Sequence, residues 1–198
     1  MTRSPRTVSC AIVAAATALG GPATAADRRI DVERSTLTVH VFKSGLFSAF
    51  ADNHVIRAPL ADGRLSEEGT LSVEIAVRTA QMTVLDPSLS ADKRAEVQTR
   101  MQGPEVLDSA RYPEIRFAST RIEPAGATEW RVTGDLSLHG VTHSVTFPVA
   151  RRDAHYRGVV SIRQREFGIQ PISIAGGTVK VKDELRIEFD IVAEAGVR

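Results

Sequence analysis

Four polar residues, His40, Asp52, Asn53 and His54, lie close together in the sequence and are the first candidates for chemistry. Imidazole nitrogens and carboxylate oxygens are ligands that transition metals accept, so His40, Asp52 and His54 could form a metal site. Their spacing matches no established ligand motif, and a hydrogen-bonded polar loop is the simpler interpretation. A third interpretation is that Asn53 or His54 contacts the polar headgroup of a ligand.

Other polar residues favour a binding protein over an enzyme. His139 and His143 are four residues apart, but the pattern around them predicts a β-turn, so His139 is expected to shape a hairpin. Arg163 and Arg165 either lie on a solvated edge or contact an anionic headgroup, since guanidinium groups match phosphate. The sequence contains no nucleophile elbow, phosphate-binding glycine loop or HExxH motif, and we therefore expect no enzymatic activity.

β-Strands are the elements that would position these residues. The stretch 128–149 alternates apolar and polar residues with a period of two, which predicts a β-hairpin. His139-Gly140 supplies its turn, because glycine adopts positive φ at little steric cost. Gly134 lies inside the first strand, where glycine more often relieves crowding than marks a site. Further strands are predicted at 35–42, 53–65 with an interruption at Pro59, 71–77, 114–120, 155–162, 178–182 and 185–191, the last two joined by a turn at Asp183-Glu184.

About eight strands in near-continuous order predict an all-β, antiparallel eight-stranded barrel. Closure of the barrel is favoured because it removes exposed strand edges. A short helical insertion is expected at about residues 90–108, with Ser90 as its N-cap, helix over 91–102, and Gly103-Pro104 as its end. The interior of such a barrel either fills with side chains or holds one small ligand.

The residues predicted to face this interior are rich in β-branched side chains and modest in aromatic ones. A wall of this composition suits an extended aliphatic ligand better than a flat aromatic one. The residues predicted to line the lumen are Val39, Val41, Val73, Ile75, Phe117, Trp130, Val132, Leu136, Leu138, Phe147, Phe167, Ile187 and Phe189.

The N-terminal segment, residues 1–26, has the pattern of a signal peptide, with Arg3 and Arg6 before a short apolar run and small residues at 23–25. Cleavage after Ala25 or Ala26 leaves one domain, residues 27–198, and removes Cys10, the only cysteine. The mature chain is expected to lack a transmembrane segment. The 25 Lys and Arg nearly balance the 24 Asp and Glu, so no nucleic-acid partner is expected.

Several motifs resemble those of one protein family. Gly134-Asp-Leu-Ser-Leu-His-Gly-Val-Thr142 resembles the signature hairpin of the YceI-like family. The stretches 107–117, with its Tyr112-Pro113, 166–169, with its Phe-Gly, and 179–187 are similar to further motifs of that family. The family consists of bacterial, mostly secreted, lipocalin-like barrels that bind polyisoprenoids and similar amphiphiles.

The resemblance implies a periplasmic carrier that holds a polyisoprenoid or fatty-acid-like lipid in its lumen, with no cofactor besides such a lipid. The headgroup would lie at a mouth formed by Phe47, Phe50, Asn53, His54, Arg163 and Arg165. Two alternatives stay open, a stress-related interaction module with a packed barrel and a metal-dependent enzyme that uses His40 and His54. A homodimer is also left open.

Overall fold

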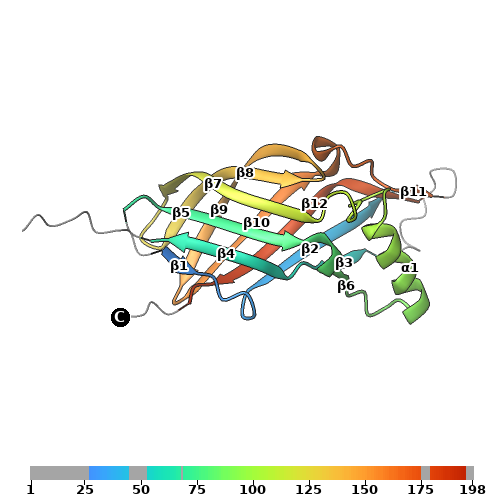
Figure 1. Ribbon diagram of the computed structural model, residues 1–198, viewed down its shortest axis with the longest axis horizontal. Helices are drawn as coiled ribbons and strands as arrows, with labels where there is room; N and C mark the ends of the chain where they lie inside the picture. Colours follow the sequence, from blue (N-terminus) through green and yellow to red (C-terminus); the bar gives the residue numbers. More distant parts are fainter. Residues whose placement is uncertain (1–26, 45–52, 68, 175–178, 195–198) are drawn as a thin grey trace, which may run out of the picture.

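The protein has an all-β fold with one short helix, seen in a computed structural model that describes residues 27–44, 53–67, 69–174 and 179–194. In these residues twelve strands form one antiparallel sheet (Figure 1), in which β11 pairs with β12 beside the main strand order β1-β4-β5-β7-β8-β9-β10-β12-β2-β3-β6. The strands are β1 (Asp27–Arg29), β2 (Thr36–Ser44), β3 (His54–Arg57), β4 (Leu60–Ser66), β5 (Ser72–Arg78), β6 (Thr83–Val84), β7 (Glu114–Pro124), β8 (Glu129–Leu138), β9 (Val141–Arg152), β10 (His155–Arg163), β11 (Ser173–Ile174) and β12 (Val179–Val192).

The predicted count of eight strands is wrong for two reasons. Pro59 lacks a backbone N–H and divides one long run into β3, which pairs with β2, and β4, which pairs with β5. Three further strands, β1, β6 and β11, contain only two or three residues each. Such short strands carry too few residues for an alternating pattern to identify them.

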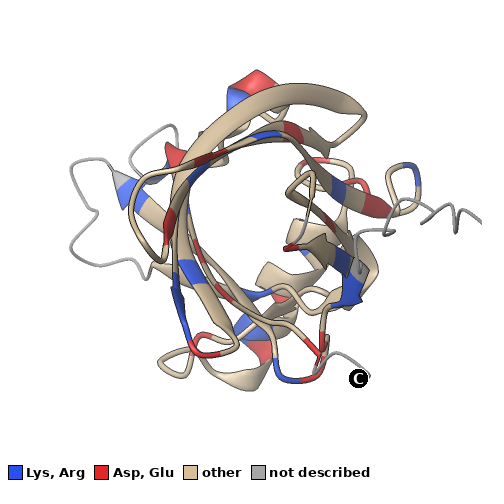
Figure 2. Cartoon of the chain, turned by 90° about the vertical axis from the view of Figure 1, so that its left-hand side faces the viewer, with Lys and Arg blue, Asp and Glu red and all other residues tan. Residues whose placement is uncertain are grey.

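The sheet curls around the long axis of the molecule, and Figure 2 shows the strands arranged around that axis. Backbone hydrogen bonds join the region of β1 to the end of β12. Asp31 N donates to Val192 O at 2.8 Å, and Glu194 N donates to Arg29 O at 2.9 Å. Because β1 also pairs with β4, both of its edges are engaged, which removes an exposed strand edge at this place.

The predicted hairpin is confirmed as β8 and β9, which pair from Leu138↔Val141 to Glu129↔Ala150. His139 and Gly140 form its two-residue turn with φ angles of 53° and 76°. Positive φ at both central positions matches the right-handed twist of the two strands. The ring of Tyr112 packs against this turn, with its centroid 4.5 Å from that of His139.

Helix α1 (Ala91–Gln102) forms at the predicted position, with Ser90 as its N-cap. Figure 1 shows it at one end of the curled sheet, next to β6. The Gln98 side chain holds the two elements together, since its Nε2 donates to Met82 O at 2.7 Å and its Oε1 accepts from Val84 N at 2.8 Å. Met101, in the last turn of the helix, is buried. The helix therefore closes part of this end of the sheet.

The predicted turn at Asp183-Glu184 is wrong, because β12 continues through these residues. Instead, the register against β2 shifts between Val181 and Leu185. Here β12 contacts the 3₁₀-helix η3 (Gln164–Phe167), whose Gln164 Nε2 donates to Lys182 O at 2.8 Å and whose Arg165 N donates to Asp183 Oδ1 at 3.0 Å. The local polarity that predicted a turn thus belongs to a bulged strand.

Glycine makes room for aromatic rings inside the curled sheet. A Cβ at Gly134 would lie 2.5 Å from Phe117 Cζ and 2.5 Å from the backbone oxygen of Ala118. A Cβ at Gly158 would lie 2.4 Å from Phe189 Cζ and 2.5 Å from Pro148 O. The Phe147 ring lies between the other two, with centroids 5.4 Å from Phe117 and 5.5 Å from Phe189. Glycine on two strands therefore permits three rings to gather.

The substitution Gly134→Ala should lower the free energy of unfolding by about 2 kcal/mol, because the added methyl group meets both a ring and a backbone oxygen. The control is Gly126→Ala in the loop before β8, where the nearest contact of a Cβ is the Glu129 side chain at 3.4 Å. This control should change stability by no more than about 0.5 kcal/mol in urea unfolding. Equal effects of the two substitutions would contradict the crowding argument.

Candidate functional site

The inside of the curled sheet contains two adjoining apolar cavities. The larger cavity, about 510 Å³, lies at the end that carries α1, and the smaller cavity, about 230 Å³, lies toward the opposite end. Their linings share five aliphatic residues, which we call the belt. The belt consists of Leu37, Val77, Ile115, Leu136 and Ile187. The two cavities are therefore neighbouring parts of one lumen.

Alternation along the strands accounts for this lining. Residues directly opposite in paired strands share a face, as do Phe117↔Leu136, Val132↔Phe147 and Ile187↔Val39. The structure places twelve of the thirteen predicted lumen residues on a cavity wall. Those on the smaller cavity are Val73, Ile75, Phe117, Trp130, Val132, Phe147 and Phe189, those on the larger are Val39, Val41 and Leu138, and Leu136 and Ile187 belong to both.

Phe167 is the exception and lines neither cavity. It is fully buried, with an exposed fraction of 0%, and its ring packs edge-on against His143 at 5.4 Å between centroids. Its backbone oxygen lies 3.3 Å from His139 Nδ1. Phe167 belongs to the 3₁₀-helix η3 and not to a strand, so alternation does not determine its direction. Its function is to pack η3 against the hairpin turn.

The mouth near α1 is polar, but only partly where predicted. Arg163 and Arg165 are exposed and line neither cavity, whereas Gln164 between them is buried and lines the larger one. Asn53 is exposed, and its Oδ1 accepts from Lys43 N at 3.3 Å. The predicted mouth residues Phe47 and Phe50, and also Asp52, lie outside the described residues. The polar side chains on the larger cavity are Lys43, His54, Lys93, Glu96, Arg100, Gln164 and Lys180.

His54 is fixed at this mouth by a buried carboxylate. The Asp86 side chain has an exposed fraction of only 1%, and its Oδ2 lies 2.6 Å from His54 Nδ1. Asp86 Oδ1 accepts from Val55 N at 2.7 Å. Because a carboxylate only accepts hydrogen bonds, Nδ1 of His54 carries the proton in this pair. Nε2 is then the ring nitrogen that Asp86 does not engage, on a side chain that lines the larger cavity.

The structure contradicts a metal site that shares His40 and His54. His54 lies opposite Val41 in the β2–β3 pair, and both line the larger cavity. His40 precedes Val41 on β2 and so faces the other side of the sheet, where its Nε2 lies 3.7 Å from Glu188 Oε1. Within the described ranges no three His, Cys, Asp or Glu side chains are grouped to hold a metal ion.

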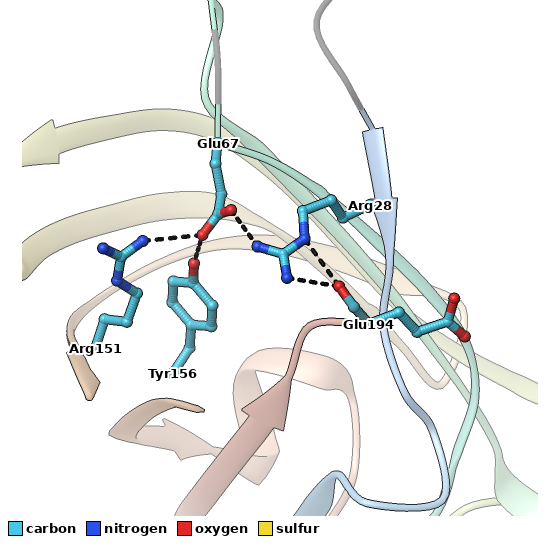
Figure 3. A network of polar contacts seen from close by, with 5 residues as sticks. All are labelled: Arg28, Glu67, Arg151, Tyr156 and Glu194. Carbon is cyan, nitrogen blue, oxygen red and sulfur yellow. Dashed lines mark hydrogen bonds and ion pairs between the residues drawn. The ribbon is translucent and has the colours of Figure 1, made fainter. Parts of the chain in front are cut away.

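A network around Glu67 lies at the other end of the lumen (Figure 3). Glu67 accepts from Arg151, at 3.1 Å, from the Tyr156 hydroxyl and from Arg28. Arg28 Nε also donates to the backbone oxygen of Glu194 at 2.9 Å. Glu67, Arg151 and Tyr156 line the smaller cavity, and the Arg151 guanidinium lies 5.9 Å from the centre of the Trp130 ring. Strand alternation gave no signal for this network.

The sequence therefore did not predict three clusters of polar contacts, which are centred on Asp86, Gln164 and Glu67. Each lies outside a regular alternating run: Asp86 precedes Pro87, Gln164 begins η3, and Glu67 follows the end of β4. A polar residue at the end of an apolar strand was the only available signal, and many solvent-exposed residues share it.

Comparison with known proteins identifies the family of this chain. A sequence model of the YceI-like domain matches residues 29–193. The chain belongs to the YceI-like family. The resemblance seen in the hairpin motif is thereby confirmed. Neither this family name nor that of the similar proteins below denotes an enzyme. Within the part of the chain that is described, no helix has the length and apolar character needed to cross a membrane.

Relatives and solved structures support this membership. A UPF0312 protein of Pseudomonas putida (strain W619) is 29% identical over 180 residues, covering 81% of this chain and 86% of the relative. A UPF0312 protein of Pseudomonas savastanoi pv. phaseolicola is 31% identical over 176 residues, covering 82% and 87%. The crystal structure of Burkholderia cenocepacia BcnA superposes with a TM-score of 0.59 at 21% identity, covering 83% of this chain and 99% of BcnA.

A second solved structure, a mutant CJ YceI protein with a monobromobimane guest, superposes with a TM-score of 0.52 at 11% identity. The match covers 71% of this chain and 82% of the CJ YceI chain. At such identities these two structures establish the fold alone. The YceI-like chain described here thus has the barrel-type fold known from YceI proteins.

The substitution Asp86→Ala should lower the free energy of unfolding by about 2 kcal/mol, because the Val55 N–H and the His54 ring both lose a buried partner. The matched control is Asp135→Ala, which removes an exposed carboxylate from β8 and should change stability by no more than about 0.5 kcal/mol. Denaturant unfolding of both variants tests this. A stability loss no larger for Asp86→Ala than for Asp135→Ala would show that the pair is unimportant.

Proposed function

We propose that this YceI-like protein binds one amphiphile, a polyisoprenoid or a fatty-acid-like lipid, and carries it in the periplasm. The observation that supports this function is the lumen of two adjoining apolar cavities with a shared aliphatic belt. The apolar tail would run from the larger cavity through the belt into the smaller one. The twelve predicted lumen residues that line the cavities would form part of the wall around it.

The cavity volumes and the chemistry of the wall favour such a ligand. Small-molecule sites usually enclose about 300–1,000 Å³, and the larger cavity alone falls in this range. Each methylene group that leaves water for an apolar wall contributes about 0.8 kcal/mol. A long tail in the lumen would therefore supply most of the binding free energy, while the polar groups at the ends would set its orientation.

We propose that the curled sheet forms a closed, lipocalin-like barrel around its ligand. The hydrogen bonds of Asp31 and Glu194 with the ends of β12 and β1 support this, because they join the two ends of the described chain. The run from β3 to β4 likewise connects a partner of β2 with a partner of β5. A wall without a gap would keep water away from the tail.

Export to the periplasm is part of the proposal. Residues 1–26 have the charge and apolar pattern of a signal peptide, and the YceI-like match begins at residue 29. The remaining chain has no cysteine, so it would need no disulfide after export. The small-molecule amphiphile is the partner we propose, with no nucleic acid, no transmembrane segment and no bound cofactor besides the lipid. Homodimerisation stays open.

The alternative of an interaction module with a packed barrel receives less support. Trp130 and Phe147 would have to fill the interior in that case, yet both line the smaller cavity. The alternative of a metal-dependent enzyme would need His40 and His54 on one face, and they lie on opposite faces of the sheet.

The first test is native mass spectrometry of residues 27–198 purified from a bacterial periplasm, followed by solvent extraction of any bound lipid. We expect a complex with one amphiphile. Protein that neither carries a lipid after purification nor takes up hexadecanoate or an isoprenoid alcohol would refute the proposal.

The belt gives a second, sharper test. In the unsubstituted protein, affinity should rise about fourfold for each methylene group added between octanoate and hexadecanoate, until the tail fills the smaller cavity. Leu136→Phe adds bulk to the belt and should lower hexadecanoate affinity about tenfold while sparing octanoate, whose shorter tail fits within the larger cavity. Isothermal titration calorimetry measures both ligands.

Asp135→Phe is the control for this test, because it adds a ring to the neighbouring exposed position on the outer face of β8. It should leave both affinities unchanged. If Leu136→Phe weakened both fatty acids equally, or neither, the tail would not pass through the belt.

A further inference from the structure

We infer that the headgroup of the bound amphiphile is anionic, a carboxylate or phosphate, and that it docks at the α1 end on Lys43 and Lys180 beside His54. This inference depends on the proposed function and specifies the class of ligand. Its basis is the distribution of charge at the two ends of the lumen.

Cations outnumber anions on the wall of the larger cavity. Lys43, Lys93, Arg100 and Lys180 face a single carboxylate, Glu96. The negative charge of Glu96 is already compensated by Lys93, whose Nζ lies 3.0 Å from Glu96 Oε2. The hydrogen bond from Lys93 holds the pKa of Glu96 below its usual range. Arg100 is also compensated, with its Nε 3.2 Å from Glu105 Oε2. Two of the four cations thus have a partner.

Lys43 and Lys180 are the remaining pair. They lie on the adjacent strands β2 and β12, where Lys43 is opposite Val181 and Lys180 is opposite Ser44, so the register turns them to opposite faces of this pair. Lys180 is the second residue of β12 and lines the cavity from the end of that strand. Lys43 is half-buried and Lys180 exposed, and both line the larger cavity. Among the residues that the structure describes, neither has an ion pair. Two lysines on this cavity wall without a carboxylate partner among the described residues leave positive charge there, which attracts an anion to this side of the mouth.

His54 lies on the same wall. It is opposite Val41, and Val41 and Lys43 share a face of β2 because they are two residues apart. Asp86 holds Nδ1 of the imidazole, which leaves Nε2 for a hydrogen bond with a ligand in the larger cavity. A headgroup with several oxygens could therefore contact the imidazole and the Lys43 ammonium group, while Lys180 adds positive charge at the end of β12.

The other end of the lumen is not equivalent. Its cations, Arg28 and Arg151, already share the Glu67 carboxylate, which also accepts from Tyr156. An anionic headgroup there would compete with Glu67 for donors that this carboxylate already engages. The charge asymmetry therefore orients the ligand, with its headgroup near α1 and its tail toward Trp130.

The single tryptophan provides the readout. Trp130 lines the smaller cavity, away from Lys43 and Lys180, so its fluorescence reports arrival of the tail and not of the headgroup. Dodecyl phosphate and dodecanol have the same tail and differ in charge. We expect dodecyl phosphate to bind about tenfold more tightly, with the difference shrinking as sodium chloride is raised. Inorganic phosphate alone should not change the fluorescence.

The double substitution Lys43→Gln/Lys180→Gln should abolish the preference, lowering dodecyl phosphate affinity about tenfold and leaving dodecanol affinity unchanged. The control Lys182→Gln removes one exposed charge from β12 at a position that lines neither cavity, and it should keep the preference. Circular dichroism checks that all variants fold.

The outcomes separate this inference from the proposed function. Equal binding of dodecyl phosphate and dodecanol by the unsubstituted protein, or an unchanged preference in the double variant, overturns the anionic headgroup and leaves the lipid-binding function standing. Failure of both amphiphiles to bind overturns the function and the inference together.

Discussion

Paired β-strands turn alternate side chains to opposite faces, and curling the sheet makes one of those faces an interior. The antiparallel pairing from β5 through β12 fixes which residues lie inside, because a shift of one residue would turn the whole apolar set outward. The same backbone hydrogen bonds hold the walls at a distance that side chains alone would not maintain. Gly134 and Gly158 adapt this frame locally, since their missing side chains leave room for Phe117 and Phe189. The lumen is thus a consequence of backbone pairing, and its shape is adjusted by a few residues.

Polar groups have different roles at the two ends of the lumen. At the end that carries β1, Glu67 accepts from two guanidinium groups and the Tyr156 hydroxyl, and it ties β1 to β9 and β10. That network engages both cations with the same carboxylate and joins segments distant in sequence, so it suits a fixed structural contact. At the α1 end, the Asp86–His54 pair is fixed, while Lys43 and Lys180 lack such compensation among the described residues. An end with unbalanced positive charge suits exchange of a ligand.

Alternation in the sequence predicted the hairpin β8–β9 and nearly the whole apolar wall, and the Ser90 N-cap with the Gly103-Pro104 end predicted helix α1. Each of these features depends on a short-range pattern that a strand or helix imposes. Alternation failed where the backbone leaves a regular strand. Phe167 looks apolar and inward in the sequence, yet the 3₁₀ turn of η3 directs it into packing against His143. Asp183 and Glu184 look like a turn, yet a bulge keeps them within β12. The polar networks around Asp86 and Glu67 could not be predicted, since their partners lie 31 to 89 positions away and only the folded chain brings them together.

An apolar lumen also has consequences for stability. Unfilled apolar space in a protein interior forfeits dispersion contacts, and engineered cavities lower stability in proportion to their volume. The walls of the two cavities here, about 510 and 230 Å³, would therefore lack such contacts when the lumen is empty. The backbone pairing of the curled sheet prevents the walls from collapsing to recover them. A tail in the lumen would restore these contacts in the folded state alone, so ligand binding and folding stability would be linked. The space that we propose as the lipid site would therefore also make the stability of this protein depend on what it binds.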